Sequence, residues 1–140
     1  MTNTAAQMFR SGMSPSGTTA ATRAVLGRYE HELYNARNLS LIPELMAEPM
    51  YRHDAGGKVT TLTNADCATR VRGFFEGFRL LVFRTVHLVV EGSVASWTYE
   101  MTATANDGTQ QVMSSIETFL IQDGKITDVW NAQHTDGPWV

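Results

Sequence analysis

Three side chains in this 140-residue chain are candidates for acid–base chemistry. Asp54 stands between "YRH" and Ala-Gly-Gly, Glu117 interrupts the apolar "SSIETFLI", and His87 lies among β-branched residues in "FRTVHLVV". A carboxylate with a modestly raised pKa can take a proton from a carbon beside a carbonyl group. Burial would raise the pKa of Glu117 and keep it neutral at pH 7, whereas in its charged form it could be the base. These residue types therefore predict proton-transfer chemistry.

Each of the three side chains also has a structural interpretation. Aspartate before glycines commonly forms an Asx-type turn. Glu117 could face solvent on the outer surface of a sheet, and His87 could be a buried histidine with satisfied ring nitrogens. The sequence leaves both interpretations open.

Aromatic side chains supply candidates for the wall of a binding cavity. They could contact a ligand or simply fill the core, which is the commoner role of such residues. The positions concerned are Tyr34, Tyr51, Trp97, Tyr99 and Trp130.

Helical periodicity and capping signals predict three helices, of which the third follows a short strand. The first, in "TTAATRAVLGRYEHELYNAR", has Thr18 or Thr19 as its cap. Its apolar stripe is Val25, Leu26, Tyr29, Leu33 and Ala36. The second is a short helix in "SLIPELMAE", with Ser40 as N-cap and Pro43 in the first turn. The third, in "TNADCATRVRGFFEGF", opens with Thr63 and Asp66 at capping-box spacing and continues with Ala68, Val71, Phe75 and Phe78.

Alternation of apolar and polar residues predicts strands on either side of the third helix. A short strand ends at the glycines of "PMYRHDAGG", and four strands follow from Leu81, the second of which has Trp97 and Tyr99 on one face. The order predicts an α+β domain in which a curved antiparallel sheet forms a cone around three N-terminal-side helices. Polar groups that face the mostly apolar interior of such a cone are the candidates for function.

The last hairpin decides which polar groups share a face. A three-residue Gln122-Asp123-Gly124 loop with a bulge would put Glu117, Val129 and Asn131 together, whereas a two-residue Asp123-Gly124 turn would pair Glu117 with Trp130. We favour the three-residue loop, because it gathers the polar pair.

Composition narrows the class of protein. The net charge is −3 and the basic residues are scattered, so no nucleic-acid-binding surface is expected. No apolar run approaches the roughly 18 residues of a membrane span, and no signal-peptide pattern is evident, so the expected location is cytoplasmic. Cys67 is the single cysteine, and the histidines show no metal-binding spacing. Residues 1–17 are predicted to be a flexible arm and residues 18–140 one domain.

Several strings, in order, resemble the nuclear transport factor 2-like superfamily, in particular its SnoaL-like and ketosteroid isomerase-like branch. They are "YNARNLSLIPELM", "HDAGG" and "QDGKITDVW", and the similarity runs from about Thr18 to His134. The resemblance implies that Asp54 is the proton-shuttling base and that Glu117 donates a hydrogen bond to an oxyanion. His87 lies in a string similar to "RT-x-H" of the scytalone dehydratase branch.

The sequence departs from the family patterns at two positions. Asn35 stands where the dehydratase branch has an aspartate, and that branch's second catalytic histidine is missing here. Asn131 stands where the SnoaL cyclases have a catalytic aspartate, and it could still orient a carbonyl or a water.

Together the residues and the resemblance predict a cofactor-independent acid–base enzyme of the isomerase, cyclase or dehydratase type. Its substrate would be a small, largely apolar carbonyl or hydroxyl compound. The expected ligand contacts are Tyr34, Asn35, Tyr51, Trp97, Tyr99, Trp130 and Asn131. The alternatives are a non-catalytic binding protein and an assembly module of the same fold. A homodimer through the sheet face is expected in each case.

Overall fold

The computed structural model describes residues 18–139. The predicted arm, residues 1–17, therefore lies outside the described residues. The helical elements precede or interrupt the strands: α1 Thr19–Arg28, the π-helix η2 Tyr29–Asn35, the 3₁₀-helix η3 Leu39–Leu41, α2 Ile42–Leu45 and α3 Asn64–Glu76. The strands are β1 Met46–Asp54, β2 Lys58–Leu62, β3 Leu80–Glu91, β4 Val94–Thr104, β5 Gln110–Gln122, β6 Lys125–Asn131 and β7 Thr135–Asp136.

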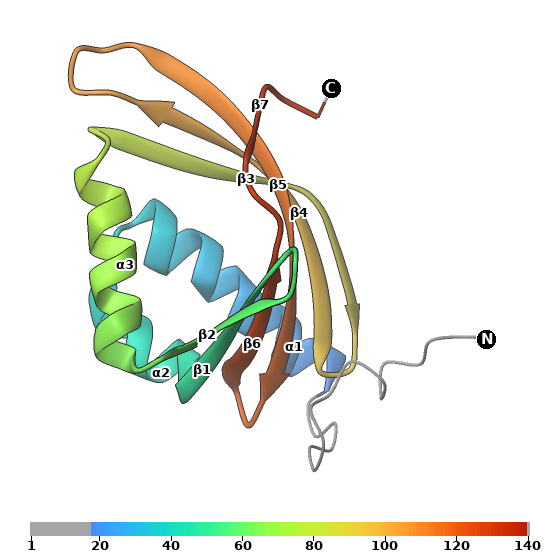
Figure 1. Cartoon of the computed structure of the whole chain (residues 1–140). Coiled ribbons are helices and arrows are strands. Elements are labelled where there is room, and N and C mark those ends of the chain that lie inside the picture. The colour runs from blue at the N-terminus through green and yellow to red at the C-terminus, as the bar shows by residue number, and fades with distance from the viewer. Residues whose placement is uncertain (1–17, 140) are drawn as a thin grey trace.

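The strands form one curled sheet in the order β2-β1-β6-β5-β4-β3, with β7 paired to β5. Figure 1 shows the long strands β3, β4 and β5 curving around the helices, with α3 standing across from them. This confirms the predicted α+β cone. The sheet is mixed rather than wholly antiparallel, because β1 and β6 run parallel. β2 and β7 were not predicted as strands.

The first predicted helix is two elements. Thr18 caps α1 by accepting a hydrogen bond from the Ala21 amide, as expected. From Tyr29 the helix widens into the π-helix η2, which ends at Asn35. Ala36 is therefore exposed beyond the helix instead of continuing its apolar stripe.

The predicted N-cap of the second helix is wrong, whereas that of the third helix is confirmed. Asn38, not Ser40, caps the second helical segment, because its side chain accepts a hydrogen bond from the Ser40 amide. Thr63 and Asp66 form the predicted capping box of α3. This box fixes where α3 begins and so which of its side chains face the sheet.

A β-bulge in the β5–β6 hairpin sets the register of the last strand. Gln122 pairs with Lys125 across a two-residue Asp123-Gly124 turn, in which both residues have positive φ (51° and 75°). The predicted three-residue loop is therefore wrong. Thr127 is an extra residue in β6, so beyond it Glu117 lies opposite Asn131. The predicted grouping of Glu117, Val129 and Asn131 on one buried face is thus confirmed by a different cause.

A second bulge changes the face on which His87 lies. Thr85 pairs with Tyr99, but His87 pairs with Thr98, so Val86 is an extra residue in β3. An uninterrupted ladder would have placed His87 opposite Trp97, whose side chain is buried. The bulge instead turns His87 to the exposed face of the sheet.

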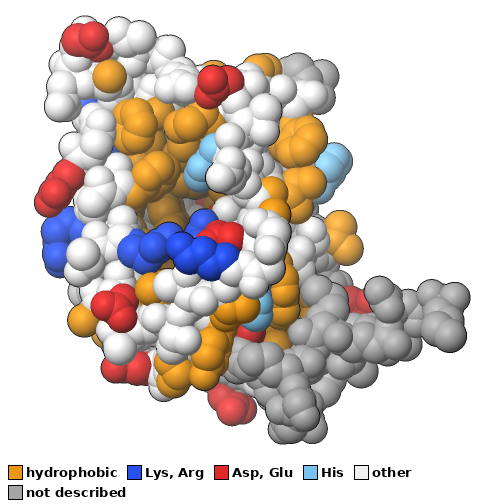
Figure 2. Space-filling view, in the orientation of Figure 1, with side chains coloured by type: hydrophobic (Ala, Val, Ile, Leu, Met, Phe, Trp, Pro, Cys, Tyr) orange, Lys and Arg blue, Asp and Glu red, His pale blue; other side chains and the backbone are white. Residues whose placement is uncertain are grey.

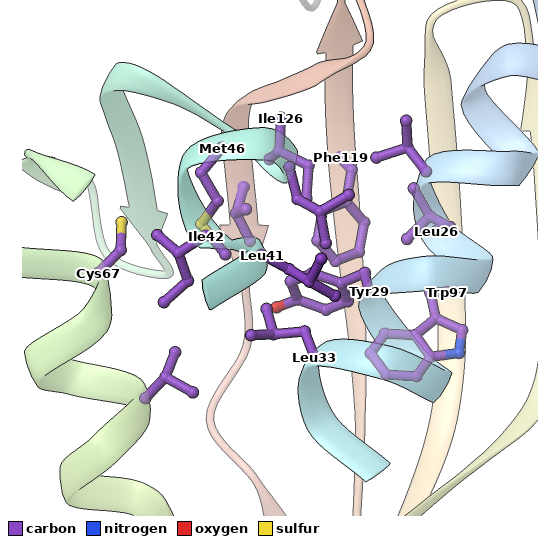
Figure 3. Close-up of a cluster of buried hydrophobic side chains, with 14 of the residues drawn as sticks. Leu26, Tyr29, Leu33, Leu41, Ile42, Met46, Cys67, Trp97, Phe119 and Ile126 are labelled. Carbon is purple, nitrogen blue, oxygen red and sulfur yellow. The ribbon is translucent and has the colours of Figure 1, made fainter. Parts of the chain in front are cut away.

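The core lies between the helices and the concave face of the sheet. Figure 3 shows Tyr29 and Leu33 of η2 close to Trp97 and Phe119 of the sheet, with Ile42 and Met46 alongside. Phe119 and Leu33 are fully buried. Among the described residues, no helix combines the length and the apolar character that crossing a bilayer requires.

Candidate active site

Glu117 lies at the centre of a row of inward side chains that crosses three strands. Trp97 of β4 and Asn131 of β6 are its register partners on either side. Glu117 is only 7% exposed, which is unusual for a carboxylate without a salt bridge. Its environment therefore determines its protonation state.

The two carboxyl oxygens of Glu117 have different surroundings. Oε1 accepts hydrogen bonds from Asn131 Nδ2 at 2.6 Å and from the Tyr99 hydroxyl at 3.2 Å. Oε2 is buried and has no hydrogen-bond partner among residues 18–139. Because Oε1 accepts from two donors, the proton of the neutral acid belongs on Oε2.

Burial raises the pKa of Glu117 above its ordinary value. The positive charge of Arg52, the hydrogen bonds from Tyr99 and Asn131 and the nearby Tyr29 hydroxyl lower the pKa of Glu117, but they do not reverse the effect of burial. The neutral acid is thus favoured to higher pH than in an exposed glutamate. A neutral carboxyl group can donate a hydrogen bond from Oε2.

His134 joins the same hydrogen-bonded chain from the segment that follows β6. Its Nε2 lies 2.9 Å from the Tyr99 hydroxyl, and its ring stacks on Phe74 at 6.2 Å between centroids. His134 is exposed toward the outer opening, but partial burial of its ring and the positive charge of Arg52 still lower its pKa below the ordinary value. The imidazole is therefore neutral at pH 7 and able to accept a proton.

These groups line a cavity of about 230 Å³ between α3, η2 and the sheet. Its walls are largely aromatic, while Glu117, Asn131 and His134 supply polar groups and Arg52 and Arg70 supply charge. Figure 2 shows the hollow on this face, with hydrophobic side chains inside it and Lys or Arg side chains along its edge. An apolar cavity with a few converging polar groups is the usual form of a small-molecule site.

Five of the residues predicted as site residues do line this cavity. They are Tyr34, Trp97, Tyr99, Glu117 and Asn131. The hydroxyl of Tyr34 accepts a hydrogen bond from Tyr29, and burial raises its pKa to about 12. The row of Trp97, Glu117 and Asn131 follows directly from the strand register.

Asp54 lies at the mouth of the cavity rather than in it. It is in register with Asn131, one strand further from Glu117, and lines the wider outer opening. Its Oδ1 accepts a hydrogen bond from Arg52 Nε at 3.2 Å. The expectation that Asp54 and Glu117 share one enclosed pocket is therefore corrected: Asp54 occupies the rim, where it holds an arginine.

Four other predicted site residues do not line the cavity. His87 lies on the exposed face, because of the bulge at Val86. The Asn35 side chain bonds the backbone N–H and C=O of Phe83 and so has a structural role. Trp130 stacks on His53 at 4.6 Å, on the opposite face of β6 from Asn131. Tyr51 is likewise absent from the wall, since Arg52 is its inward neighbour on β1.

Several cavity residues were missed by sequence reasoning. They are Tyr29, Arg52, Arg70, Val71, Phe74, Phe83 and His134. Only His134 had a detectable signal, because it follows Asn131 closely at the end of a strand already rich in polar groups. Among the described residues, no three His, Cys, Asp or Glu side chains are grouped so that they could hold a metal ion.

The fold and this site define a class: α+β cone proteins with a small, aromatic, acid-containing cavity between helices and sheet. Within that class the chain belongs to the SnoaL-like domain family, whose model matches residues 26–129. This confirms the resemblance found in the sequence. The comparison with curated proteins finds no match.

Solved structures of similar shape carry several functional descriptions. A "putative polyketide cyclase" from Acidithiobacillus ferrooxidans has 21% identity, a TM-score of 0.69, and coverage of 85% of this chain and 89% of its own. AclR, a "putative hydroxylase" from Streptomyces galilaeus, has 17% identity, a TM-score of 0.72, and coverage of 86% and 83%. An LEH-like epoxide hydrolase from M. tuberculosis has 10% identity, a TM-score of 0.68, and coverage of 81% and 83%. At these identities the likeness shows the fold alone.

Proposed function

We propose that this protein is a cofactor-independent acid–base enzyme that acts on a small, largely apolar carbonyl compound. The observation that carries the proposal is the Glu117 carboxyl group, which is buried with a raised pKa and has Oε2 without a partner among the described residues. A buried polar atom without a partner is costly unless a further group completes its hydrogen bond, and Glu117 as a residue lines the cavity in which a ligand could do so. Neighbours of the same fold described as a cyclase and an epoxide hydrolase support a catalytic role.

In the proposed reaction, Glu117 donates a hydrogen bond from Oε2–H to the substrate's carbonyl oxygen. Because the one proton of the Tyr99 hydroxyl goes to Glu117, Nε2 of His134 donates to Tyr99 and Nδ1 is the nitrogen that takes a proton from the carbon beside the carbonyl. The electron pair of the C–H bond moves into an enolate, whose negative oxygen Glu117 stabilises. Return of the proton to another carbon isomerises the substrate, while attack of the enolate on a second carbonyl closes a ring. Tyr99 bridges the acid and the base, since its hydroxyl contacts both side chains.

This assignment moves the base from Asp54 to His134 and keeps Glu117 as the donor. His134 lines the cavity, whereas Asp54 lines only its mouth and engages Arg52. The neutral imidazole has the proton-accepting capacity that the reaction needs, because its pKa is lowered.

The test needs no knowledge of the natural substrate. Exchange of the α-protons of 2-tetralone in D₂O, followed by NMR, reports proton abstraction by itself. Glu117→Ala should slow exchange by about 10²–10³, the usual cost of one oxyanion donor, and Glu117→Gln should cost less because the amide still donates. His134→Gln should slow exchange by ~10²–10⁴ through loss of the base.

Glu91, an exposed residue at the end of β3, provides the control. Glu91→Gln should exchange at the wild-type rate. Equal losses in Glu117→Gln and Glu117→Ala would show that Glu117 acts as the base instead of the donor. Wild-type exchange in all three cavity variants would refute the enzyme proposal and favour a binding protein.

The homodimer expected from the sequence stays a prediction. The outer face of the sheet exposes Val82, Val89 and Ile116, beside threonine and serine register partners on β4. Light scattering on the purified protein tests it directly, since a monomer at micromolar concentration would contradict it.

A further inference from the structure

The mouth of the cavity is strongly cationic. Within the described part of the chain, the outer opening, of about 800 Å³, is lined by Arg52, Lys58 and Arg70 against one carboxylate, that of Asp54. Arg52 and Arg70 also line the aromatic cavity, so the two spaces are continuous. A protein with a net charge of −3 has thus concentrated positive charge at the opening of its largely aromatic cavity.

Arg52 has donor groups to spare at this opening. Its Nε donates to Asp54 at 3.2 Å, while Nη1 and Nη2 have no hydrogen-bond or ion-pair partner among residues 18–139. Its side chain is 26% exposed, so part of the guanidinium is already withdrawn from water. Asp54 fixes the orientation of the guanidinium, and the free edge presents two parallel N–H groups suited to a carboxylate.

Arg70 faces Arg52 from the other side of the opening. It lies on α3 next to Val71, which lines the cavity, whereas Arg52 lies on β1 of the sheet. Arg70 is exposed and forms no ion pair within the described residues. Two arginines from different elements, with a single acid among the lining residues, leave an excess of positive charge for a ligand to neutralise.

The interior is suited to the other end of such a ligand. Tyr34, Phe74, Phe83 and Trp97 supply aromatic walls to a space of about 230 Å³. An apolar cavity of about 150 Å³ holds a benzene molecule, so this space suits a fused two-ring compound. One end of the site therefore selects for rings and the other for negative charge.

We infer that the ligand of this cavity is an aromatic or polycyclic carboxylate, whose rings lie between Phe74 and Trp97 and whose carboxylate is held between Arg52 and Arg70. This deepens the proposed function, since it specifies the substrate class of the same cavity. The carboxylate anchors the ligand at the mouth, and the reacting carbonyl then lies deeper, toward Glu117.

Binding can be measured without catalysis. Isothermal titration calorimetry compares 2-naphthoate with its neutral counterpart, 2-acetylnaphthalene. The carboxylate should bind at least about tenfold more tightly, as expected for a charge-assisted pair of hydrogen bonds. This preference should decrease between about 50 and 500 mM NaCl, because the mouth is open to screening ions.

Substitutions at the mouth test which side chains cause the preference for 2-naphthoate over 2-acetylnaphthalene. Arg52→Gln should reduce it to less than about threefold, and Arg70→Gln should reduce it partly, while 2-acetylnaphthalene binds unchanged. Arg72→Gln is the matched control, since Arg72 is exposed on the same helix but does not line the opening. It should keep the full preference for the carboxylate.

Two results would overturn the inference: equal affinity for the two probes, or an undiminished preference in both Arg52→Gln and Arg70→Gln. Absence of 2-naphthoate binding would overturn it as well. The proposed function is judged separately by 2-tetralone exchange, because that probe carries no charge. A protein that binds naphthoate through its arginines but exchanges no protons would retain this inference and lose the proposed chemistry.

Discussion

The two oxygens of the Glu117 carboxyl group differ in their hydrogen bonding. Oε1 is held by Asn131 and Tyr99, which fixes the orientation of the group, while Oε2 has no partner among the described residues. Orientation by one oxygen and availability of the other are the features required of a preorganised hydrogen-bond donor. Asn131 therefore orients the carboxyl group without taking its proton. A more basic side chain at this position would compete for that proton.

Glu117 and His134 should give the stability of the protein two opposite pH dependences. Unfolded Glu117 titrates near 4.5, and burial raises its pKa in the fold, so between these values the folded state holds a proton that the unfolded state has released. The free energy of unfolding therefore falls as pH rises through this window, by up to about 1.4 kcal/mol per pH unit. For His134, whose pKa is lowered from 6.5, stability instead falls as pH drops below 6.5.

Urea unfolding followed by tryptophan fluorescence, from pH 4.5 to 8, separates the two contributions. Glu117→Gln should lack the loss of stability at rising pH that the wild type shows, and His134→Gln should lack the loss at falling pH. Curves for wild type and Glu117→Gln that stay parallel over the whole range would mean that the pKa of Glu117 is not raised.

At the scale of elements, β-bulges decide which side chains reach the cavity. The extra residue Thr127 turns Asn131 inward, and the extra residue Val86 turns His87 outward. Beside the second bulge, the Thr85 amide and hydroxyl donate to Glu30 of η2 at 3.1 and 2.7 Å. The carboxylate thus gives the Thr85 backbone N–H a hydrogen-bond partner next to the irregularity in strand pairing. Thr85 in turn accepts from Trp97 Nε1 at 2.7 Å and so holds a wall of the cavity.

Sequence patterns predicted what depends on local chemistry. The α3 capping box and the inward face of β4, with Trp97 and Tyr99, follow from spacing alone. A bulge depends on one residue of register between distant strands, which periodicity does not encode, so the position of His87 was beyond such reasoning. His134 and Arg52 were missed for a similar reason, because they line one cavity only when β6 pairs with β1 and the chain after β6 returns beside β5.

The capping box of α3 provides a stability test at this scale. Thr63→Ala removes the side chain that accepts from the Asp66 amide, and it should lower the free energy of unfolding by about 1 kcal/mol. Thr69→Ala is the matched control, because Thr69 is exposed within the same helix and alanine has the higher helix propensity. Urea denaturation should show a loss for the first and no loss for the second; equal effects would contradict a specific role of the cap.

At the scale of the whole molecule, core and cavity belong to one aromatic network. Ring contacts run from Phe119 to Tyr29 at 5.2 Å and from Tyr29 to Trp97 at 5.9 Å. They continue from Trp97 to Phe83 at 5.9 Å and from Phe83 to Phe74 at 6.4 Å. The same packing that stabilises the fold thus holds the walls of the site, so a ligand should stabilise the protein as it completes the network.

The two ends of this network should respond differently to truncation. Phe119 is fully buried in the core, so Phe119→Ala should cost about 3–5 kcal/mol of unfolding free energy. Phe74 is half-buried on the cavity wall, so Phe74→Ala should cost less, because part of its ring faces the cavity rather than packed atoms. Urea denaturation measures the stability, and calorimetry measures the binding of 2-acetylnaphthalene. Phe74→Ala should weaken the binding of this probe by about tenfold, because a ring contact is lost. If Phe74→Ala instead destabilised the fold as much as Phe119→Ala and left probe binding intact, Phe74 would be a core residue and the ligand would lie elsewhere.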